Sequence, residues 1–498
     1  MMLRGDPNEI LERLQQLRAA DAPTHGGHVL SYVYDSGLAE LDDLASAAMR
    51  AVQSVNGLDP TTFTSVAVME REVIGFARDM LGGDEDVVGT VTTGGTESCL
   101  LAVKTARDVW RAGGGVGQPR LVAPVTVHAA FRKAAHYFGL SLDLVAVDAF
   151  TGAVTASDLV DRLGPDVALV VVSAPAYPFA GLDPVAEVAA ACEQAGVSCH
   201  VDACIGGWVL PFWSGASLAP WDFSVPGVSS ISADIHKYGY APKGASVLLQ
   251  RGRDRQRLQY FATTGWPGYP VVNPTMLGSK SAGPLAASWA IIHALGRDGF
   301  AELAASCARS TQALIELIGT IDGLRVVGTP VGPLFAVATD ESVPIERRVD
   351  PHHWADAARA AGWMLQQQPG LTQGDGSCLA PTTHLTVTPV TESVLEQLFE
   401  ALVRAADAVR AVPPVAAEAV LAALPAELLQ ELSAPDAPAL DAQTAFGILR
   451  QIGLVAEGGD GGLPQQMAPF LALIEALPHP LTERLLTELL ARVVEPPG

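Results

Sequence analysis

Short, wholly apolar segments alternate with helical patterns through the middle of the chain. From about residue 61 these segments are Leu121 to Ala123, Leu144 to Val147, Val167 to Val172 and Val197 to Val201. Strands buried on both faces of a parallel sheet have this continuous apolar character, and the helices between them complete βαβ units. The pattern predicts an α/β fold with functional loops at the carboxyl ends of the strands.

Other patterns flank this region. Apolar residues at helical spacing from Ile10 to Leu17 predict helices in the first 60 residues. After about residue 310, a helix from Thr311 to Ile321, alternating segments and a helix from Glu392 to Val412 indicate a small α+β domain. We therefore expect an N-terminal helical arm (1–60), a large domain (61–310), a small domain (311–411) and a C-terminal extension (412–498).

The C-terminal extension is rich in Ala, Leu and Pro and contains 11 acidic and 3 basic residues. Its apolar periodicity predicts short helices. We expect these helices to be broken at Pro425, Pro435, Pro464 and Pro478. No catalytic group of residues is evident in this part of the sequence.

Composition narrows the functional classes. The 498 residues are 49% hydrophobic and 17% charged, as in a globular protein, and the formal net charge is −23. Such a charge repels nucleic acid and anionic lipid surfaces, so we expect neither as a partner. The charged N-terminus and the lack of an apolar run of about 18 residues lead us to expect a cytoplasmic protein. Six cysteines without a Cys-x-x-Cys pair indicate free thiols and no structural zinc site.

The first candidate for chemistry is the glycine-rich segment Thr92-Thr-Gly-Gly-Thr-Glu-Ser98. It follows a predicted strand and precedes an amphipathic helix, so its backbone amides can approach an anion at the helix N-terminus. An ordinary capped helix start has the same composition, and the segment alone does not decide between the two.

The second candidate is Cys199-His-Val-Asp-Ala-Cys-Ile-Gly-Gly207, in which Asp202 ends an apolar strand. Asp202 is either a structural cap or the counter-ion that keeps a heteroaromatic nitrogen protonated. Successive residues of a strand face opposite sides, so Cys199, His200, Asp202 and Cys204 cannot all converge on one metal ion. We therefore expect no metal.

Two further candidates are basic. Lys237 follows an apolar segment and lies between His236 and Tyr238. Burial lowers the pKa of an amine and makes Schiff-base chemistry possible. His128 follows another predicted strand end. The order of the four motifs along one βαβ series predicts that they share one edge of the sheet, where a single cofactor could meet them.

Together these motifs resemble a known family. Thr93-Gly-Gly-Thr-Glu-Ser98, His128-Ala-Ala-Phe131, His200-Val-Asp-Ala-Cys-Ile-Gly-Gly207 and Ser232-Ala-Asp-Ile-His-Lys-Tyr-Gly-Tyr-Ala-Pro-Lys-Gly244 are similar to the sphingosine-1-phosphate lyase branch of the pyridoxal-phosphate-dependent group II decarboxylases. The likeness extends from about residue 30 to 410. It implies a type I aminotransferase-like fold, pyridoxal 5'-phosphate as cofactor, and a homodimer whose active sites contain residues of both chains.

The resemblance also implies roles for single residues. Lys237 would form the Schiff base, Asp202 would pair with the ring nitrogen, and His128 would stack on the ring. Residues expected to hold the cofactor phosphate are Gly94, Gly95, Thr96 and His236, with Ser279 contributing across the dimer interface. Lys243 would lie near an anionic group of the substrate.

The chain departs from the lyase pattern where the substrate is expected. The segment Asn56-Gly-Leu-Asp-Pro60 has an acid where the lyases have a histidine, and Trp266-Pro-Gly-Tyr-Pro-Val271 moves a tyrosine by two places. Tyr32, Tyr34 and Tyr269 are our candidates to compensate. These differences favour an altered, less anionic substrate.

The leading hypothesis is a carbon–carbon lyase that performs retro-aldol cleavage of a 3-hydroxy amine or amino acid. One alternative is an amino-acid decarboxylase, because the same residues would serve the loss of carbon dioxide. Others are an aminotransferase and a catalytically idle paralogue that binds a protein partner. Intact Lys237 and Asp202 argue against the idle paralogue.

Overall fold

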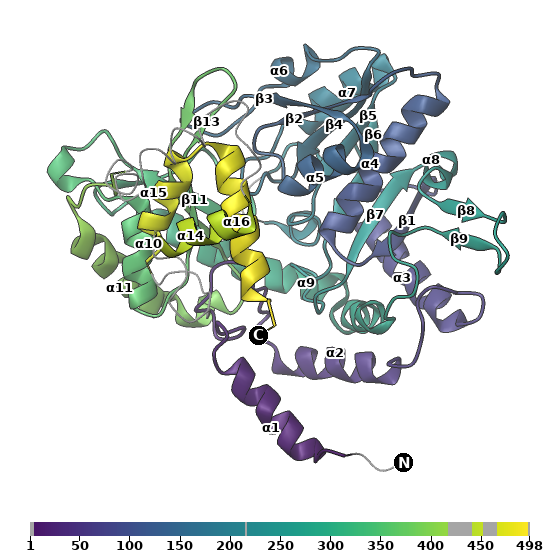
Figure 1. The fold of residues 1–498 in the computed structure, drawn as a ribbon, viewed down its shortest axis with the longest axis horizontal. Helices are drawn as coiled ribbons and strands as arrows, with labels where there is room; N and C mark the ends of the chain where they lie inside the picture. The colour runs from purple at the N-terminus through teal and green to yellow at the C-terminus, as the bar shows by residue number, and fades with distance from the viewer. Residues whose placement is uncertain (1–3, 215–216, 417–440, 452–465, 497–498) are drawn as a thin grey trace.

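A seven-stranded sheet lies at the centre of the computed structural model, which describes residues 4–214, 217–416, 441–451 and 466–496 (Figure 1). The strands follow the order β1-β7-β6-β5-β4-β2-β3, and only β7 runs antiparallel to its neighbours. The predicted, mostly parallel sheet is thus confirmed. The strands are β1 (Val87–Thr92), β2 (Arg120–Pro124), β3 (Ser141–Val145), β4 (Val167–Ser173), β5 (Ser198–Asp202), β6 (Val228–Ala233) and β7 (Ser246–Arg251).

Both faces of this sheet are buried, which explains its continuous apolar segments. On β4, Leu169 and Val171 pack into one hydrophobic cluster, whereas Val170 and Val172 pack into another. Side chains alternate along a strand, so a strand between two cores must be apolar at every position. The sequence placed β3 about three residues too late, because this edge strand is only partly buried and its apolar pattern is incomplete.

Helices cover the two faces of the sheet (Figure 1). The cluster on one face contains residues of α4 and α5, and the cluster on the other contains residues of α3, α7 and α9. The helices of the large domain are α3 (Thr64–Met80), α4 (Gly95–Ala112), α5 (Ala129–Phe138), α6 (Ala156–Val160), α7 (Val185–Ala195), a 3-10 turn (Leu210–Phe212), α8 (Arg253–Arg257) and α9 (Gly283–Ile318). A separate two-stranded hairpin consists of β8 (Phe261–Thr263) and β9 (Val271–Asn273).

The small domain has its own sheet and its own core. Its four-stranded sheet has the order β10-β11-β15-β12. Phe335, Trp354, Leu385 and Leu402 are fully buried in its hydrophobic cluster. Its elements are β10 (Leu324–Val326), β11 (Leu334–Thr339), a 3-10 turn (Ile345–Arg347), α10 (Pro351–Ala360), β12 (Gln366–Gln368), β13 (Leu371–Thr372), β14 (Cys378–Leu379), β15 (Thr382–Thr386) and α11 (Thr391–Val409).

One long helix, α9, belongs to both domains. The expected boundary at residue 310 falls inside it, because α9 continues from Gly283 to Ile318. Phe300 and Cys307 pack in the core of the large domain, whereas Leu314 and Ile318 pack in the core of the small domain. The helical backbone is interrupted at Gly296, which has φ +56° and ψ −169°.

Helices at both ends of the chain complete the fold. The arm contains α1 (Pro7–Arg18) and α2 (Ala39–Ala51), and between them Val29 bridges to Met364 of the small domain. The C-terminal helices are α14 (Ala442–Gln451), α15 (Ala468–Ala476) and α16 (His479–Val493). Pro478 lies at the break before α16, as predicted, whereas Pro425, Pro435 and Pro464 lie outside the described residues. No helix in the described ranges has the length and apolar character needed to cross a bilayer.

The break in α9 gives a stability prediction. At Gly296 the backbone adopts a conformation that is almost restricted to glycine, although a Cβ would meet no atom within 4 Å. We expect Gly296→Ala to lower the free energy of unfolding by about 1–3 kcal/mol through backbone strain alone. Urea denaturation followed by circular dichroism measures this change.

Gly75 provides the matched control, because it lies inside α3 and its Cβ would also meet no atom within 4 Å. Its backbone is helical, so Gly75→Ala should stabilise the protein by about 0.5–1 kcal/mol. Equal effects of the two substitutions would contradict the assignment of strain to Gly296.

Candidate active site

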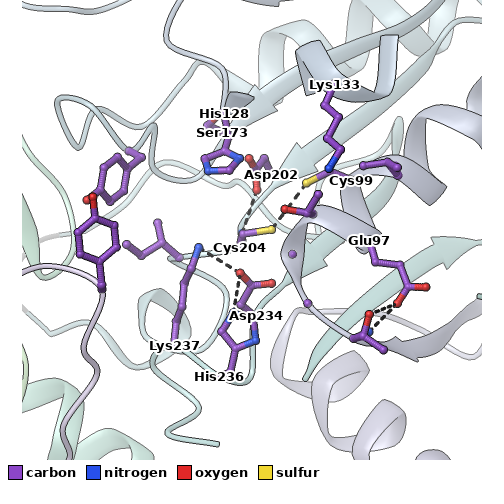
Figure 2. A pocket seen from close by; sticks show the side chains of 18 of the residues that line it. Glu97, Cys99, His128, Lys133, Ser173, Asp202, Cys204, Asp234, His236 and Lys237 are labelled. Atoms are coloured by element: carbon purple, nitrogen blue, oxygen red, sulfur yellow. Dashed lines mark hydrogen bonds and ion pairs between the residues drawn. The ribbon is translucent and has the colours of Figure 1, made fainter. Parts of the chain in front are cut away.

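The four sequence motifs meet at one cavity of about 830 Å³ at the carboxyl edge of the central sheet. Gly94 follows β1, His128 follows β2, Asp202 ends β5 and Lys237 follows β6; all four line the cavity. Figure 2 shows His128 and Asp202 on one side of the open space and Lys237 on another. The strand order thus brings together residues that are far apart in the sequence, as the βαβ pattern predicts.

The turn between β1 and α4 forms a cup with little room for side chains. Gly94 has φ +148°, and a Cβ there would lie 3.3 Å from the His236 ring. A Cβ on Gly95 would lie 2.5 Å from the Asp234 carboxylate. The backbone amides at the start of α4 therefore stay accessible, and a helix N-terminus of this kind attracts an anion such as phosphate.

Glu97 fixes the shape of the cup. One of its carboxylate oxygens accepts hydrogen bonds from the backbone N–H and the hydroxyl of Thr93, at 2.6 and 2.7 Å. The other accepts the backbone N–H of Met276 at 2.6 Å. Glu97 thereby connects the cup to the segment that follows β9 and holds both in place.

Asp234 controls the charge of Lys237. The Lys237 Nζ lies 3.0 Å from Asp234 Oδ2; the Asp234 side chain is buried, and that of Lys237 is mostly buried, with 21% exposed. Burial alone would lower the pKa of Lys237, but the Asp234 carboxylate outweighs it and holds that pKa well above its usual value. For Asp234, burial likewise opposes ionisation, yet Lys237 and His236 keep its pKa below the ordinary range. The pair is therefore charged at neutral pH.

Asp202 is a buried carboxylate without a cation. It is 7% exposed, and in the described part of the chain it forms no ion pair. Its Oδ1 accepts the backbone N–H of Cys204 at 3.1 Å. Buried carboxylates are ordinarily paired, so this one is suited to a positively charged group of a ligand. His128 caps α5, with its Nδ1 accepting the backbone N–H of Ala130 at 3.2 Å, and this bond orients the ring beside Asp202 (Figure 2).

Two thiols lie at the base of the cavity. Cys99 Sγ and Cys204 Sγ are 4.0 Å apart, and their ligand atoms and that of Asp202 lie within 4.8 Å of one another. Burial raises the pKa of Cys99, and the contact with Cys99, followed by burial, raises that of Cys204. Both thiols therefore keep their protons at neutral pH. His200 lies apart from this group, because its ring nitrogens contact Ser230 and Ser232.

Tyrosines and Lys243 form another part of the site. Tyr32 and Tyr34 line the cavity, and the Lys243 ammonium lies 4.7 Å from the centre of the Tyr34 ring. Desolvation, together with the charge of Lys237, lowers the pKa of Lys243 to about 8. Burial raises the pKa of Tyr34. At neutral pH this corner of the site therefore presents a cation and a neutral phenol.

Besides Lys243, two expected site residues do not line the cavity. Ser279 is two residues beyond Leu277, which lines the cavity, and its Oγ accepts a hydrogen bond from Asn56 Nδ2 at 3.2 Å. Tyr269 is 63% exposed in the connection between β8 and β9 and packs on Trp266. A single chain does not bring either residue into its own site.

Asp59, the acid that stands where the lyases have a histidine, has a local structural role. Its carboxylate accepts hydrogen bonds from the hydroxyls and backbone N–H groups of Thr61 and Thr62. These bonds lower its pKa to about 2. Asp59 does not line the cavity of its own chain, so it does not repel an anion there.

Sequence reasoning missed several residues of the site. Asp234 stands inside the quoted Lys237 motif and could have been found from its spacing, because it precedes the lysine by three positions, which brings the two side chains together on a turn. Tyr177 and the segment Gln366 to Pro369 also line the cavity. That segment comes from the small domain, and only its run of three glutamines, unusual for a strand, distinguishes it in the sequence.

These residues fit pyridoxal phosphate. The cup between β1 and α4 suits the phosphate, the unpaired Asp202 carboxylate suits a protonated ring nitrogen, and Lys237 supplies a primary amine between them. Gly94, Gly95, Thr96 and His236 surround the cup, and all line the cavity.

Comparison with known families supports the same conclusion. The family described as "Pyridoxal-dependent decarboxylase conserved domain" matches residues 52–327. A second family, described as "Pyridoxal-dependent enzyme, C-terminal putative HTH domain", matches residues 426–492. The C-terminal extension, which the sequence reading did not connect with any family, thus matches one that is described for pyridoxal-dependent enzymes.

Several similar proteins carry the name sphingosine-1-phosphate lyase. The chain is 34% identical to the Dictyostelium discoideum lyase, in a match that covers 71% of this chain and 67% of that protein. It is also 34% identical to the rat lyase, in a match that covers 71% of this chain and 61% of that protein. A Burkholderia pseudomallei sphingosine-1-phosphate lyase structure has a TM-score of 0.75 at 31% identity, covering 87% of this chain and 97% of that one. Lactobacillus brevis glutamate decarboxylase, at 19% identity and a TM-score of 0.72, shares the fold.

The family match covers the residues that form the candidate cofactor site. The matched region contains the cup, His128, Asp202 and Lys237. The chain belongs to the pyridoxal-dependent decarboxylase family, in the branch that resembles sphingosine-1-phosphate lyases, and is a pyridoxal-phosphate-dependent lyase.

Proposed function

We propose that the enzyme cleaves the bond between carbons 2 and 3 of a phosphorylated 2-amino-3-hydroxy compound by retro-aldol cleavage. The products are an aldehyde from carbon 3 and a phosphorylated amine that keeps carbon 2. The Lys243 ammonium does not itself line the cavity, but it lies 4.7 Å from the centre of the Tyr34 ring, which does. This cation, available to an anionic substrate group, is the observation that carries the proposal. The names of the similar proteins support the same substrate class.

The residues of the cavity have different roles in the proposed reaction. When bound, pyridoxal phosphate supplies a protonated ring that accepts the electron pair of the bond that breaks. Asp202 favours the charge on that ring, and the amides at the start of α4 hold the phosphate. His128 is positioned by its bond to Ala130 so that it can cover one face of the ring.

We assign removal of the 3-hydroxyl proton to Lys237 Nζ in its neutral form, which the amine would have when pyridoxal phosphate is bound and the substrate amine has replaced Lys237 on it. Burial raises the pKa of both Tyr34 and Tyr177, so these phenols keep their protons and act as hydrogen-bond donors. Once the bond has broken, carbon 2 takes up a proton, which balances the reaction without any oxidant or reductant. The Asp234 carboxylate, 3.0 Å from Nζ, keeps the lysine directed into the site.

We also propose that the active form is a homodimer. Large apolar side chains are exposed on the β8–β9 hairpin and just beyond it, among them Phe261, Trp266, Val272 and Leu277. Exposed large apolar side chains that lie close together in the sequence are typical of a protein interface. Ser279 and Tyr269, which lie outside the cavity of their own chain, would then serve the site of the partner.

A product assay tests the reaction. The enzyme loaded with pyridoxal phosphate should convert sphingosine-1-phosphate to equal amounts of a long-chain aldehyde and phosphoethanolamine. Lys237→Ala should lower the rate by at least about a hundredfold, because it removes both the cofactor linkage and the proposed base. Mass spectrometry of both products measures the outcome.

Other products would reject the proposal. Carbon dioxide from amino acids without aldehyde would identify a decarboxylase, and amino transfer to a 2-oxo acid would identify an aminotransferase. If the wild-type protein takes up the cofactor, shown by a visible absorption band, but converts no substrate of any of these classes, the idle paralogue remains.

The pKa of Lys243 predicts a pH dependence. Lys243 is positively charged below about pH 8 and loses its charge above it, whereas a phosphate monoester stays dianionic. The KM for the phosphorylated substrate should therefore rise about tenfold between pH 7 and pH 9.5. In Lys243→Arg the charge persists, so the KM should stay nearly constant. A wild-type KM that does not change over this range would show that Lys243 does not bind the phosphate.

The dimer is tested by its mass in solution. Val272→Asp places a charge in the proposed interface, and light scattering should show a shift from dimer to monomer. Val116→Asp is the control, since Val116 is 91% exposed between α4 and β2, away from the hairpin. A monomeric wild type would disprove the proposal.

A further inference from the structure

The C-terminal helix α15 is hydrogen-bonded at its N-terminus to α10 and near its C-terminus to Gly370, which follows one wall of the active-site cavity. Its N-terminus contacts Asp356 on α10, and near its C-terminus Glu475 contacts Gly370. Between the ends, Phe470, Leu471 and Leu473 are buried. Gly370 directly follows Gln366 to Pro369, which line the cavity.

Asp356 joins the helix and the wall through one carboxylate. Its Oδ1 accepts the side-chain amide of Gln367 and the backbone N–H of Met467, both at 2.9 Å. Its Oδ2 accepts the backbone N–H of Ala468, also at 2.9 Å. The carboxylate therefore caps α15 from a different part of the chain and anchors β12 at the same time.

The wall is also held at Gln368, whose amide donates to the Pro178 carbonyl and to Thr382 Oγ1, both at 2.9 Å, whereas the side chain of Gln367 is held by α10. Gln367 is 6% exposed, and the second bond of its amide goes to the carbonyl of His352, which also belongs to α10. The Gly370 N–H donates to Glu475 Oε1 at 2.8 Å. The side chain of Gln367 and the backbone of Gly370 are thus held by α10 and α15, with Asp356 between the two helices.

We propose that Asp356 is a positioning residue for the active site, and that docking of α15 on it sets the substrate affinity of the cavity through the wall Gln366 to Pro369. This inference rests on the proposed function for its kinetic part only. It gives the C-terminal extension a role on its own chain. Asp356 does not line the cavity, so its removal should change binding more than the chemical step.

The experiment compares Asp356→Ala with Asp441→Ala in the full-length enzyme loaded with pyridoxal phosphate. Asp441 is the matched control, because it accepts the Thr444 N–H at 2.9 Å at the start of α14 and has no contact with the wall. Hydrogen exchange of residues 365–372 is measured in both, followed by KM and kcat with sphingosine-1-phosphate.

In Asp356→Ala we expect exchange in residues 365–372 to increase about tenfold and KM to rise by a similar factor. The kcat should change less than about twofold, and the visible band of the cofactor should be retained. Asp441→Ala should leave exchange of the wall and KM unchanged. Equal exchange and KM in the two variants would overturn the proposal.

A second variant covers the case in which Asp356→Ala does not fold. Gln367→Leu removes the bond between the wall and Asp356 but leaves both contacts of Asp356 with α15. It should produce the same increase in exchange and KM, and an unchanged wall would overturn the proposal. The exchange measurement needs no turnover, so failure of the proposed lyase activity would be distinguished from failure of this inference.

Discussion

The buried ion pair of Asp234 and Lys237 is the interaction on which the site depends most. Asp234 lies 2% exposed at the end of β6, and its carboxylate holds Lys237, faces His236 and leaves no space for a side chain at position 95. Removing one partner of a buried pair leaves an uncompensated charge and costs about 3–5 kcal/mol. The pair therefore constrains the lysine, the histidine and the glycine turn together. It also explains why the cup at α4 is built from glycine on the side that faces Asp234.

The topology of the sheet provides the rest of the arrangement. Parallel strands end at one edge, so β1, β2, β5 and β6 each deliver one loop to the cavity without any long connection. The strands can be apolar throughout because both faces are covered, which leaves polar residues to the loops. The large domain thus supplies the cofactor-binding groups, and the small domain supplies the glutamine-rich wall opposite them. The cavity therefore combines side chains from different domains of the chain.

Sequence reasoning predicted the cofactor-binding half of this site and little of the other half. His128, Asp202 and Lys237 follow apolar strands, so local pattern and strand order were enough to place them on one edge. Gln366 to Pro369 reach the cavity through packing of the small domain against the large one, and Asp356 reaches α15 across more than 100 residues of sequence. No local pattern carries such information. The resemblance already assigned Ser279 to a site other than that of its own chain, whereas the position of Tyr269 outside the cavity was not predictable, because motif spacing does not reveal where a loop lies.

The shared helix α9 has a mechanical consequence. Between Phe300 and Ile318 it contains neither glycine nor proline, and within that stretch it passes from the core of the large domain to the core of the small domain. Sharp bends in helices occur almost only at such residues or at comparable defects, so this stretch acts as a rigid strut. The two walls of the cavity are therefore parts of one stiff frame. We therefore expect ligands to enter and leave without a swing of the two domains about this helix.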